Sequence, residues 1–295
     1  MKYKNTGRKV FLIFNYVFLI IAGLICLLPF INLLAVSLSS SSAVAAGSVS
    51  FIPKEFTLSS YKFVLESARF MKAFWVSIKR VLLGVSINML VMICTAYPLS
   101  KSKRQLMGKS IYTWYFVITM LIGGGLIPTY LVIVKLRLID TIWSLVLPGA
   151  LPVYNMIILM NFFKSIPEEL EEAAQIDGAG VWTILWKIVL PISKPGLATV
   201  ALFCIVSHWN SWFDGLIYMN NPNHYPLQSY LQTLVINPEQ MLKIAGGDYT
   251  KILAMVNART GRAAQLFLGA LPIIIVYPFL QKYFSSGLLL GSVKG

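Results

Sequence analysis

The richest group of polar and aromatic side chains within an apolar run is Ser207-His208-Trp209-Asn210-Ser211-Trp212-Phe213-Asp214. Sugars are bound by aromatic faces together with a few planar hydrogen-bonding side chains. These residue types therefore predict an oligosaccharide pathway lined by Trp209, Asn210, Trp212 and Asp214. Helical spacing would place Asn210 with Asp214, and His208 with Trp212, on two adjacent faces. An aromatic belt at the membrane interface is the alternative, because Asp214 lies near the end of the run.

A second group of residues with functional potential is the acidic stretch 165–191, which reads SIPEELEEAAQIDGAGVWTILWKIVLP. It contains five of the eleven acidic residues of the chain. Ser165 and Glu168 have the spacing of a capping box, which predicts a helix with Ser165 as its N-cap. The helix macrodipole favours carboxylates in the first turns. Gly178 and Gly180 predict where the helix ends. A solvated connecting helix has the same features, so the pattern alone leaves a docking surface and a plain linker open.

Nothing in the sequence predicts catalysis, a metal site or a bound cofactor. The two histidines, His208 and His224, stand alone, and neither a GxSxG nor an HExxH motif occurs. The cysteines lie inside apolar runs without a CxxC pair, which argues against disulfides and structural zinc. Gly108-Lys109-Ser110 resembles the end of a phosphate-binding loop, but Lys103 stands where the first glycine is required. We therefore expect any ATP to be bound by another chain.

The composition is that of a membrane protein. The 295 residues are 57% hydrophobic and 12% charged, with a mean hydropathy of +0.72, whereas soluble domains carry about 25% charged residues. A net charge of +14 would favour a nucleic-acid partner in a soluble protein. Here the basic residues lie mainly at the ends of apolar runs, a pattern typical of membrane orientation. We predict contact with a lipid bilayer and none with nucleic acid.

The apolar runs predict an all-α polytopic fold that forms one membrane domain over residues 1–295. Crossing the bilayer takes about 20 residues, and runs of this length cover approximately 10–36, 76–98, 111–134, 142–163, 196–218 and 263–284. The first run is too long for the apolar part of a signal peptide, so we expect it to remain as a span. The three glycines 123–125 allow a helix break in the third. Lys79 and Arg80 are expected to extend toward the lipid headgroups.

Six spans place both termini on one side of the membrane. The short loop 101–109 carries four basic residues and no acid, and short basic loops face the cytoplasm. We therefore predict that both termini and the loop 165–191 are cytoplasmic and that loops 37–72 and 219–262 are extracytoplasmic. The second of these outer loops is long for a structureless connection, so we expect it to have its own fold and task.

The acidic stretch resembles a known pattern in its letters. Glu172-Ala173-Ala174, three residues, Gly178, nine residues and then Ile188-Val189-Leu190-Pro191 is similar to the EAA motif in permease subunits of ATP-binding-cassette (ABC) importers. The surrounding SIPEELEEAAQIDGAG and the segment TAYPLSK (95–101) resemble the carbohydrate-uptake branch of this type I, binding-protein-dependent family. The tail GLLLGSVKG resembles that of the maltose-importer permease. The resemblance covers essentially the whole chain.

The resemblance implies a permease that forms half of the pathway of an ATP-driven oligosaccharide importer in the bacterial cytoplasmic membrane. It implies that the EAA loop is a coupling helix docked on the ATPase through Glu172, Ala173, Ala174, Gly178, Ile188, Leu190 and Pro191. The implied partners are a second homologous permease, an ABC ATPase dimer that binds ATP and Mg, and an extracytoplasmic solute-binding protein. In the maltose system the partner permease supplies the sugar site, so direct substrate contact by this chain stays open.

Three alternatives follow from the residues. Lys243, Lys251, Arg259 and Arg262 outnumber the acids of the long outer loop, which favours either an acidic substrate, such as a uronate oligomer, or anchoring to anionic lipid. An ion-coupled secondary transporter would need an intramembrane carboxylate, for which only Asp214 qualifies. A membrane scaffold or sensor would not require the EAA spacing.

Overall fold

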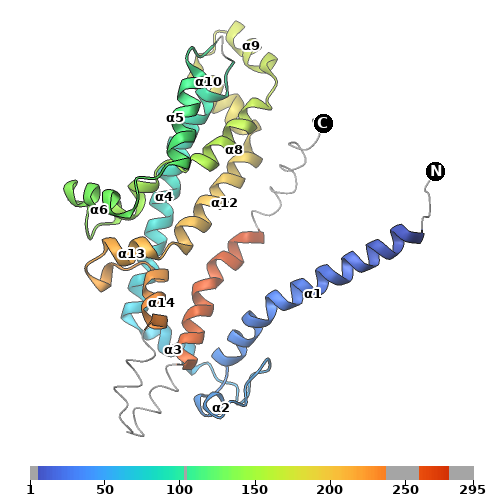
Figure 1. The fold of residues 1–295 in the computed structure, drawn as a ribbon, viewed down its shortest axis with the longest axis vertical. Coiled ribbons are helices and arrows are strands. Elements are labelled where there is room, and N and C mark those ends of the chain that lie inside the picture. The colour runs from blue at the N-terminus through green and yellow to red at the C-terminus, as the bar shows by residue number, and fades with distance from the viewer. Residues whose placement is uncertain (1–5, 103–104, 237–258, 279–295) are drawn as a thin grey trace. The chain divides into compact units, whose positions relative to one another are not determined.

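The structure, a computed structural model, describes residues 6–102, 105–236 and 259–278, and it contains helices but no strand in those ranges (Figure 1). Two parts of the chain are compact, and each is described by itself. The first comprises residues 1–71 with 233–271, and the second comprises residues 72–232 with 272–295. Lys243, Lys251 and the GLLLGSVKG tail lie outside the described residues.

The first part begins with the long helix α1 (Thr6–Ser37), which is followed by α2 (Ser41–Ala45) and α3 (Ser59–Glu66). A further helix, Arg259–Pro278, starts in this part. Large apolar side chains along α1, such as Phe14 and Ile20, are exposed. An apolar helix with exposed sides requires a lipid environment or another chain to cover it. In the loop after α1, Glu55 accepts hydrogen bonds from Ser40 and Ser42, and these bonds lower the pKa of its carboxyl group.

The second part is built on α4 (Ala68–Ser100), an unbroken helix that contains Pro98 in its last turn. The elements that follow, in chain order, are α5 (Lys109–Leu121), α6 (Leu126–Lys135), α7 (Ile142–Val146), a 3-10 turn (Leu147–Gly149), α8 (Val153–Lys164), α9 (Glu168–Ile176), α10 (Val181–Ile184), a π-helical turn (Leu185–Val189), α11 (Leu190–Ile192), α12 (Lys194–Asn210), α13 (Phe213–Tyr218), a 3-10 turn (Pro222–His224) and α14 (Leu227–Ile236). In Figure 1, α9 and α10 lie at one end of this part, and α13 and the start of α14 lie toward the other.

The described helices can be compared with the six predicted spans. Three are long and apolar enough to cross a bilayer, and the number rises to six if each of three bent pairs counts as one span. The pair α5 and α6 bends by 108° at Ile122–Gly125, where Gly125 has a φ of +82°. The predicted glycine break is therefore present. The six-span arrangement itself remains a prediction.

The predicted continuous helix over 196–218 is wrong in one respect, because α12 ends at Asn210 and Ser211 is extended. Side-chain hydrogen bonds compete with the helix at this point. The Asp214 carboxylate accepts from the Ser211 hydroxyl at 2.8 Å and from the backbone N–H of Gly215 at 2.9 Å. Asn210 and Asp214 are therefore not one turn apart on one helix, contrary to the spacing argument.

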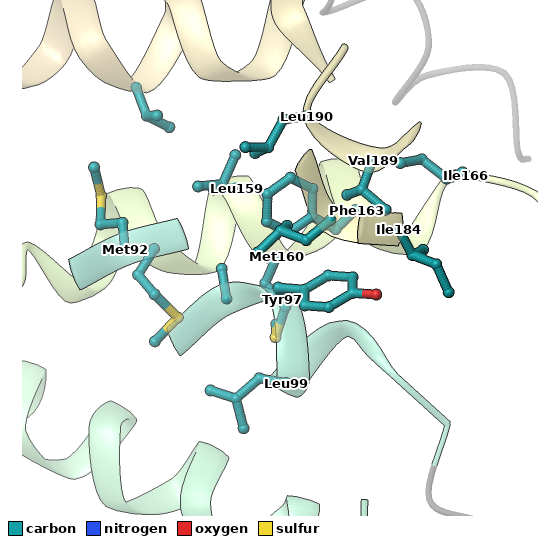
Figure 2. Close-up of a cluster of buried hydrophobic side chains, with 14 of the residues drawn as sticks. Met92, Tyr97, Leu99, Leu159, Met160, Phe163, Ile166, Ile184, Val189 and Leu190 are labelled. Atoms are coloured by element: carbon teal, nitrogen blue, oxygen red, sulfur yellow. The ribbon is translucent and has the colours of Figure 1, made fainter. Parts of the chain in front are cut away.

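The main core of the second part joins α4, α8, the turn after α10 and α12. Figure 2 shows buried side chains from these elements, including Tyr97, Met160, Phe163 and Ile184, gathered into one cluster. Tyr97 and Phe163 meet edge to face, with ring centroids 6.3 Å apart. This cluster is directly beneath the acidic loop, since Ala174 and Ile188 pack against it.

Close packing of α8 against α12 depends on Gly196, and we predict that Gly196→Ala destabilises the protein. A Cβ at this position would lie 2.5 Å from Cγ of Phe162, and such overpacking costs about 1–3 kcal/mol. Thermal unfolding of the purified protein in detergent measures the effect. Gly23→Ala is the control, because a Cβ there meets nothing within 4 Å. Equal melting temperatures for the two variants would contradict the prediction.

Candidate functional site

The acidic stretch forms the exposed helix α9, but it does not begin as the sequence predicts. Ser165 is the C-cap of the preceding helix α8, and its hydroxyl donates to the carbonyl of Phe162 at 2.7 Å. The N-cap of α9 is Pro167, which makes no side-chain capping bond. The capping-box prediction is wrong because α8 runs up to Lys164 and uses the serine at its own end. Glu168, Glu169 and Glu171 do lie in the first turn of α9, where the macrodipole favours them.

The other end of α9 is determined by Gly178. The backbone N–H of Gly178 donates to Gln175 O at 3.0 Å, and that of Ala179 donates to Ala174 O at 2.9 Å. This bond pattern is a Schellman motif, in which the residue after the C-cap adopts the left-handed conformation. Gly178 has the required φ of +82° and open space where a Cβ would lie. A side chain there would be strained by its backbone and would project outward.

The two alanines of the motif lie on different faces of α9. Ala173 and Glu172 are exposed, whereas Ala174 packs against the buried cluster of the second part. Helix α9 thus rests on the core through one small residue and presents its other side outward. Small residues on an exposed face allow another backbone to approach closely.

The end of the motif forms a helical turn that leads into α12. Pro191 cannot donate a backbone hydrogen bond, and its ring would clash with the carbonyl four residues earlier in a regular α-helix. The chain responds with the π-helical turn Leu185–Val189, in which the Leu190 N–H donates to Leu185 O. Leu190 is buried, Ile188 packs against the same cluster, and the helices on either side of Ser193 are bent by 81°.

Near the opposite end of the second part, α4 and α13 are joined by a buried ion pair. The Arg80 guanidinium contacts both oxygens of Asp214, and its Nη1 also donates to the carbonyl of Ser211 at 3.2 Å. Arg80 is only 2% exposed. The expectation that it extends to the headgroups is therefore wrong for Arg80, because the Asp214 carboxylate and a free backbone carbonyl compete for it inside the protein. Lys79 remains exposed.

Asn88 connects two further elements to α4. Its amide nitrogen donates to the carbonyls of Gly149 and Ala150 at 2.6 and 2.9 Å, where the helix breaks between α7 and α8. Its Oδ1 accepts from Nε2 of His208 at 2.7 Å. Gly84 makes room for this histidine, because a Cβ there would overlap the imidazole ring. His208 is thus a packing residue with a hydrogen-bond partner, as its isolation in the sequence indicates.

A cavity of about 410 Å³ lies between the end of α4 and the loop, and a second of about 320 Å³ lies beside the Arg80–Asp214 pair. Polar side chains that line the second cavity are Arg80, Asn88, Ser144, Asn155, Ser207, His208, Ser211, Asp214 and Tyr218. No cluster of three or more potential metal ligands occurs among the described residues.

The sequence alone did not identify Arg80 and Asn88 as residues that line a polar cavity. Two polar residues eight apart in an apolar run share a helix face, and that spacing was the available signal.

The four predicted pathway residues do not share one surface. Asp214 lines the polar cavity, whereas Trp209 is 3% exposed and packs edge-on against Phe74. Asn210 is exposed at the end of α12, and Trp212 is 40% exposed beyond the helix break. The structure therefore brings only Asp214 to the cavity, because the break at Ser211 sends the neighbouring side chains in other directions.

Loop 136–141 is tied to the segment after α13 through Asp140. Asp140 Oδ1 accepts from the backbone N–H groups of Asn220 and Asn221 at 3.1 and 3.2 Å and lies 3.0 Å from Nδ1 of His224. Burial alone would raise the pKa of Asp140, but these donors outweigh burial and lower it. The carboxylate is thereby kept ionised and the two segments are held together.

The described residues contain apolar helices of membrane-spanning length and an exposed acidic helix. These features are those of a membrane protein with an extramembrane loop helix. Residues 1–289 match the family described as "Binding-protein-dependent transport system inner membrane component", and the chain belongs to this family. The family resemblance predicted from the EAA stretch is confirmed.

Several relatives match nearly the full length of the chain. "Protein LplC" of Bacillus subtilis (strain 168) is 40% identical over 293 residues, which are 99% of this chain and 98% of LplC. The "Polygalacturonan/rhamnogalacturonan transport system permease protein YtcP" of the same organism is 38% identical and covers 98% of this chain and 99% of YtcP. A solved structure, "Crystal structure of a bacterial ABC transporter involved in the import of the acidic polysaccharide alginate", matches with a TM-score of 0.86 and 31% identity, over 96% of this chain and 100% of that chain.

We predict that Arg80→Met destabilises the protein much more than Lys79→Met. Removing one partner of a buried ion pair leaves an uncompensated charge, at a cost of about 3–5 kcal/mol. Lys79 is the matched control, since it is the adjacent cation on α4 and is exposed. Thermal unfolding in detergent measures both variants. In the double variant Arg80→Met/Asp214→Asn we expect partial recovery, and equal losses in the two single variants would refute the assignment of a buried pair.

Proposed function

We propose that this chain is the permease subunit of an ABC importer for acidic oligosaccharides and that α9 couples it to the ATPase. The observation that supports the coupling proposal is the conformation and packing of the EAA stretch. An exposed helix ends in a left-handed glycine, rests on the core through Ala174 and continues through an 81° bend into α12. Force applied to α9 can reach a membrane helix without passing through a flexible linker.

The family description supports the rest of the proposed assembly. A binding-protein-dependent inner membrane component works with a solute-binding protein on the outside and with an ATPase on the inside. We propose a second homologous permease and an ATPase dimer, with ATP and Mg bound by the ATPase and no nucleotide bound by this chain. The termini and α9 face the cytoplasm in this proposal, so that α9 can reach the ATPase.

The proposed substrate class is supported by two relatives. The names of the polygalacturonan/rhamnogalacturonan permease and of the alginate importer both specify acidic polysaccharides. Uronic acid units carry one carboxylate each, so such a chain is a polyanion whose recognition differs from that of a neutral sugar. We propose a uronate-containing oligosaccharide as the cargo.

One observation argues against an ion-coupled secondary transporter. Such a mechanism needs an intramembrane carboxylate that is free to bind and release a cation. Asp214, the carboxylate considered from the sequence, is held by Arg80, Ser211 and the Gly215 N–H. A carboxylate with these partners is neutralised within the chain.

We predict that Gly178→Arg uncouples transport from ATP hydrolysis while the protein still inserts in the membrane. The variant places a bulky side chain on the outer side of α9 and strains a φ of +82°, at about 1–2 kcal/mol for the backbone alone. In proteoliposomes with the full complex, ATP hydrolysis stimulated by the loaded binding protein should be lost. Gly178→Ala, which keeps the strain but adds little bulk, should lose much less. Normal uptake by Gly178→Arg would mean that α9 does not dock on the ATPase.

We predict that uronate oligosaccharides, rather than neutral ones, are imported by the complex. The matched comparison uses one oligogalacturonate and the same oligomer with its carboxyl groups reduced to alcohols, because chain length and linkages then stay constant. Binding to the cognate binding protein by calorimetry and uptake into proteoliposomes are both measured. A preference for the reduced, neutral oligomer would remove the acidic-substrate proposal without affecting the coupling proposal.

A further inference from the structure

One carboxylate of α9 differs from its neighbours in its surroundings. Glu168, Glu169 and Glu172 are exposed, whereas the side chain of Glu171 is 15% exposed and forms an ion pair with Lys101. Lys101 follows directly after the last residue of α4. The EAA helix is thus joined by a charge pair to a membrane helix that lies seventy residues earlier in the chain.

Tyr97 completes this contact from one turn further back on α4. Its hydroxyl lies 3.4 Å from Oε2 of Glu171, and the ammonium of Lys101 lies 4.0 Å from the centre of its ring. The ring itself belongs to the buried cluster shown in Figure 2. The Lys101–Glu171 pair is therefore held between an aromatic side chain packed in the core and the helix that we propose to dock on the ATPase.

The end of α4 also contacts the start of α5. The Lys109 ammonium donates to the backbone carbonyl of Lys101, so the turn between α4 and α5 is closed by a side chain. Lys101 is 18% exposed in its side chain, and the adjoining 410 Å³ cavity is lined partly by the apolar side chains of Val181, Trp182 and Leu185. Partial burial weakens screening by water, which makes this pair stronger than a surface pair.

Helix α4 links this contact to the polar cavity. It runs without interruption from Ala68 to Ser100 and carries Asn88 and Arg80, which bond the helix breaks before α8 and after α12. At 1.5 Å per residue, Asn88 lies about 20 Å from Lys101 along the helix axis. A displacement of α9 that pulls on Lys101 would therefore reach both breaks through a single rigid element.

We infer that Lys101 and Tyr97 are positioning residues, which tie the coupling helix to α4 and so transmit its movement to the breaks that border the polar cavity. This inference rests on the proposed coupling function of α9. It assigns α4 as a second transmission route beside the covalent route from α9 through Pro191 to α12. Glu171 then belongs to the intramolecular route, unlike the exposed carboxylates of the same helix.

The test is a charge exchange in the complete complex, with both permeases, the ATPase and the binding protein in proteoliposomes. The variants are Glu171→Lys, Lys101→Glu and the two combined, and the readout is substrate imported per ATP hydrolysed. Each single variant places two like charges together, and we expect this ratio to fall by about fivefold or more, the usual lower bound for coupling between sites. The combined variant restores an opposite pair, so most of the ratio should return.

Two controls separate coupling from simple stability. Lys79→Gln removes an exposed cation from α4, away from α9, and should leave imported substrate per ATP at the wild-type ratio. Tyr97→Phe keeps the buried ring but removes the hydroxyl near Glu171, so we expect a smaller loss than in the charge reversals. If the single reversals only lower the amount of complex, with an unchanged ratio, or if the combined variant fails to recover, the inference is wrong.

A different experimental result would show that α9 does not couple to the ATPase at all. In that case Gly178→Arg would also retain wild-type stimulation of ATP hydrolysis. If Gly178→Arg uncouples transport while the Lys101 and Glu171 reversals do not, α9 docks on the ATPase but α4 does not carry its movement.

Discussion

The arrangement of helices in the second part depends on hydrogen bonds to the backbone groups that are left without a partner where helices break. Carbonyls released at a break cannot find water within a bilayer, so side chains must satisfy them. Arg80 does so for Ser211 and Asn88 for Gly149 and Ala150. Both donors lie on α4, which makes this helix the common support of α7, α8, α12 and α13. Asp214 neutralises the buried guanidinium that this arrangement requires.

The acidic loop follows a different physical rule. Its helix is exposed and polar on one side, and its position is defined by packing on the cluster below it and by the Lys101–Glu171 pair. Gly178 and Pro191 supply the two backbone features, a left-handed residue and a missing donor, that shape the turns around α9 and before α12. These contacts join the loop to the ends of α4 and α12, as the transmission role that we propose for it requires.

Sequence patterns predicted the family, the helical class and the location of α9, because each depends on local composition and spacing. They failed where a neighbouring helix end, a local side-chain bond or a partner far along the chain competed with the expected arrangement. Ser165 has capping-box spacing but lies at the end of α8. Arg80 looks like an interfacial cation but pairs with Asp214, 134 residues later. The tryptophans near Asn210 look like a sugar platform, yet the break at Ser211 separates them.

By itself, the sequence determined that this is a helical membrane protein of the ABC-importer permease family, since hydropathy and the EAA spacing are carried by neighbouring residues. Only the tertiary structure decided which of the acidic residues are free to meet a partner and which are used internally. The physical reason is that a charge within an apolar bundle must find its counter-charge wherever the fold brings one near. Arg80 found Asp214 and Lys101 found Glu171, and neither pairing is visible in the spacing of the residues.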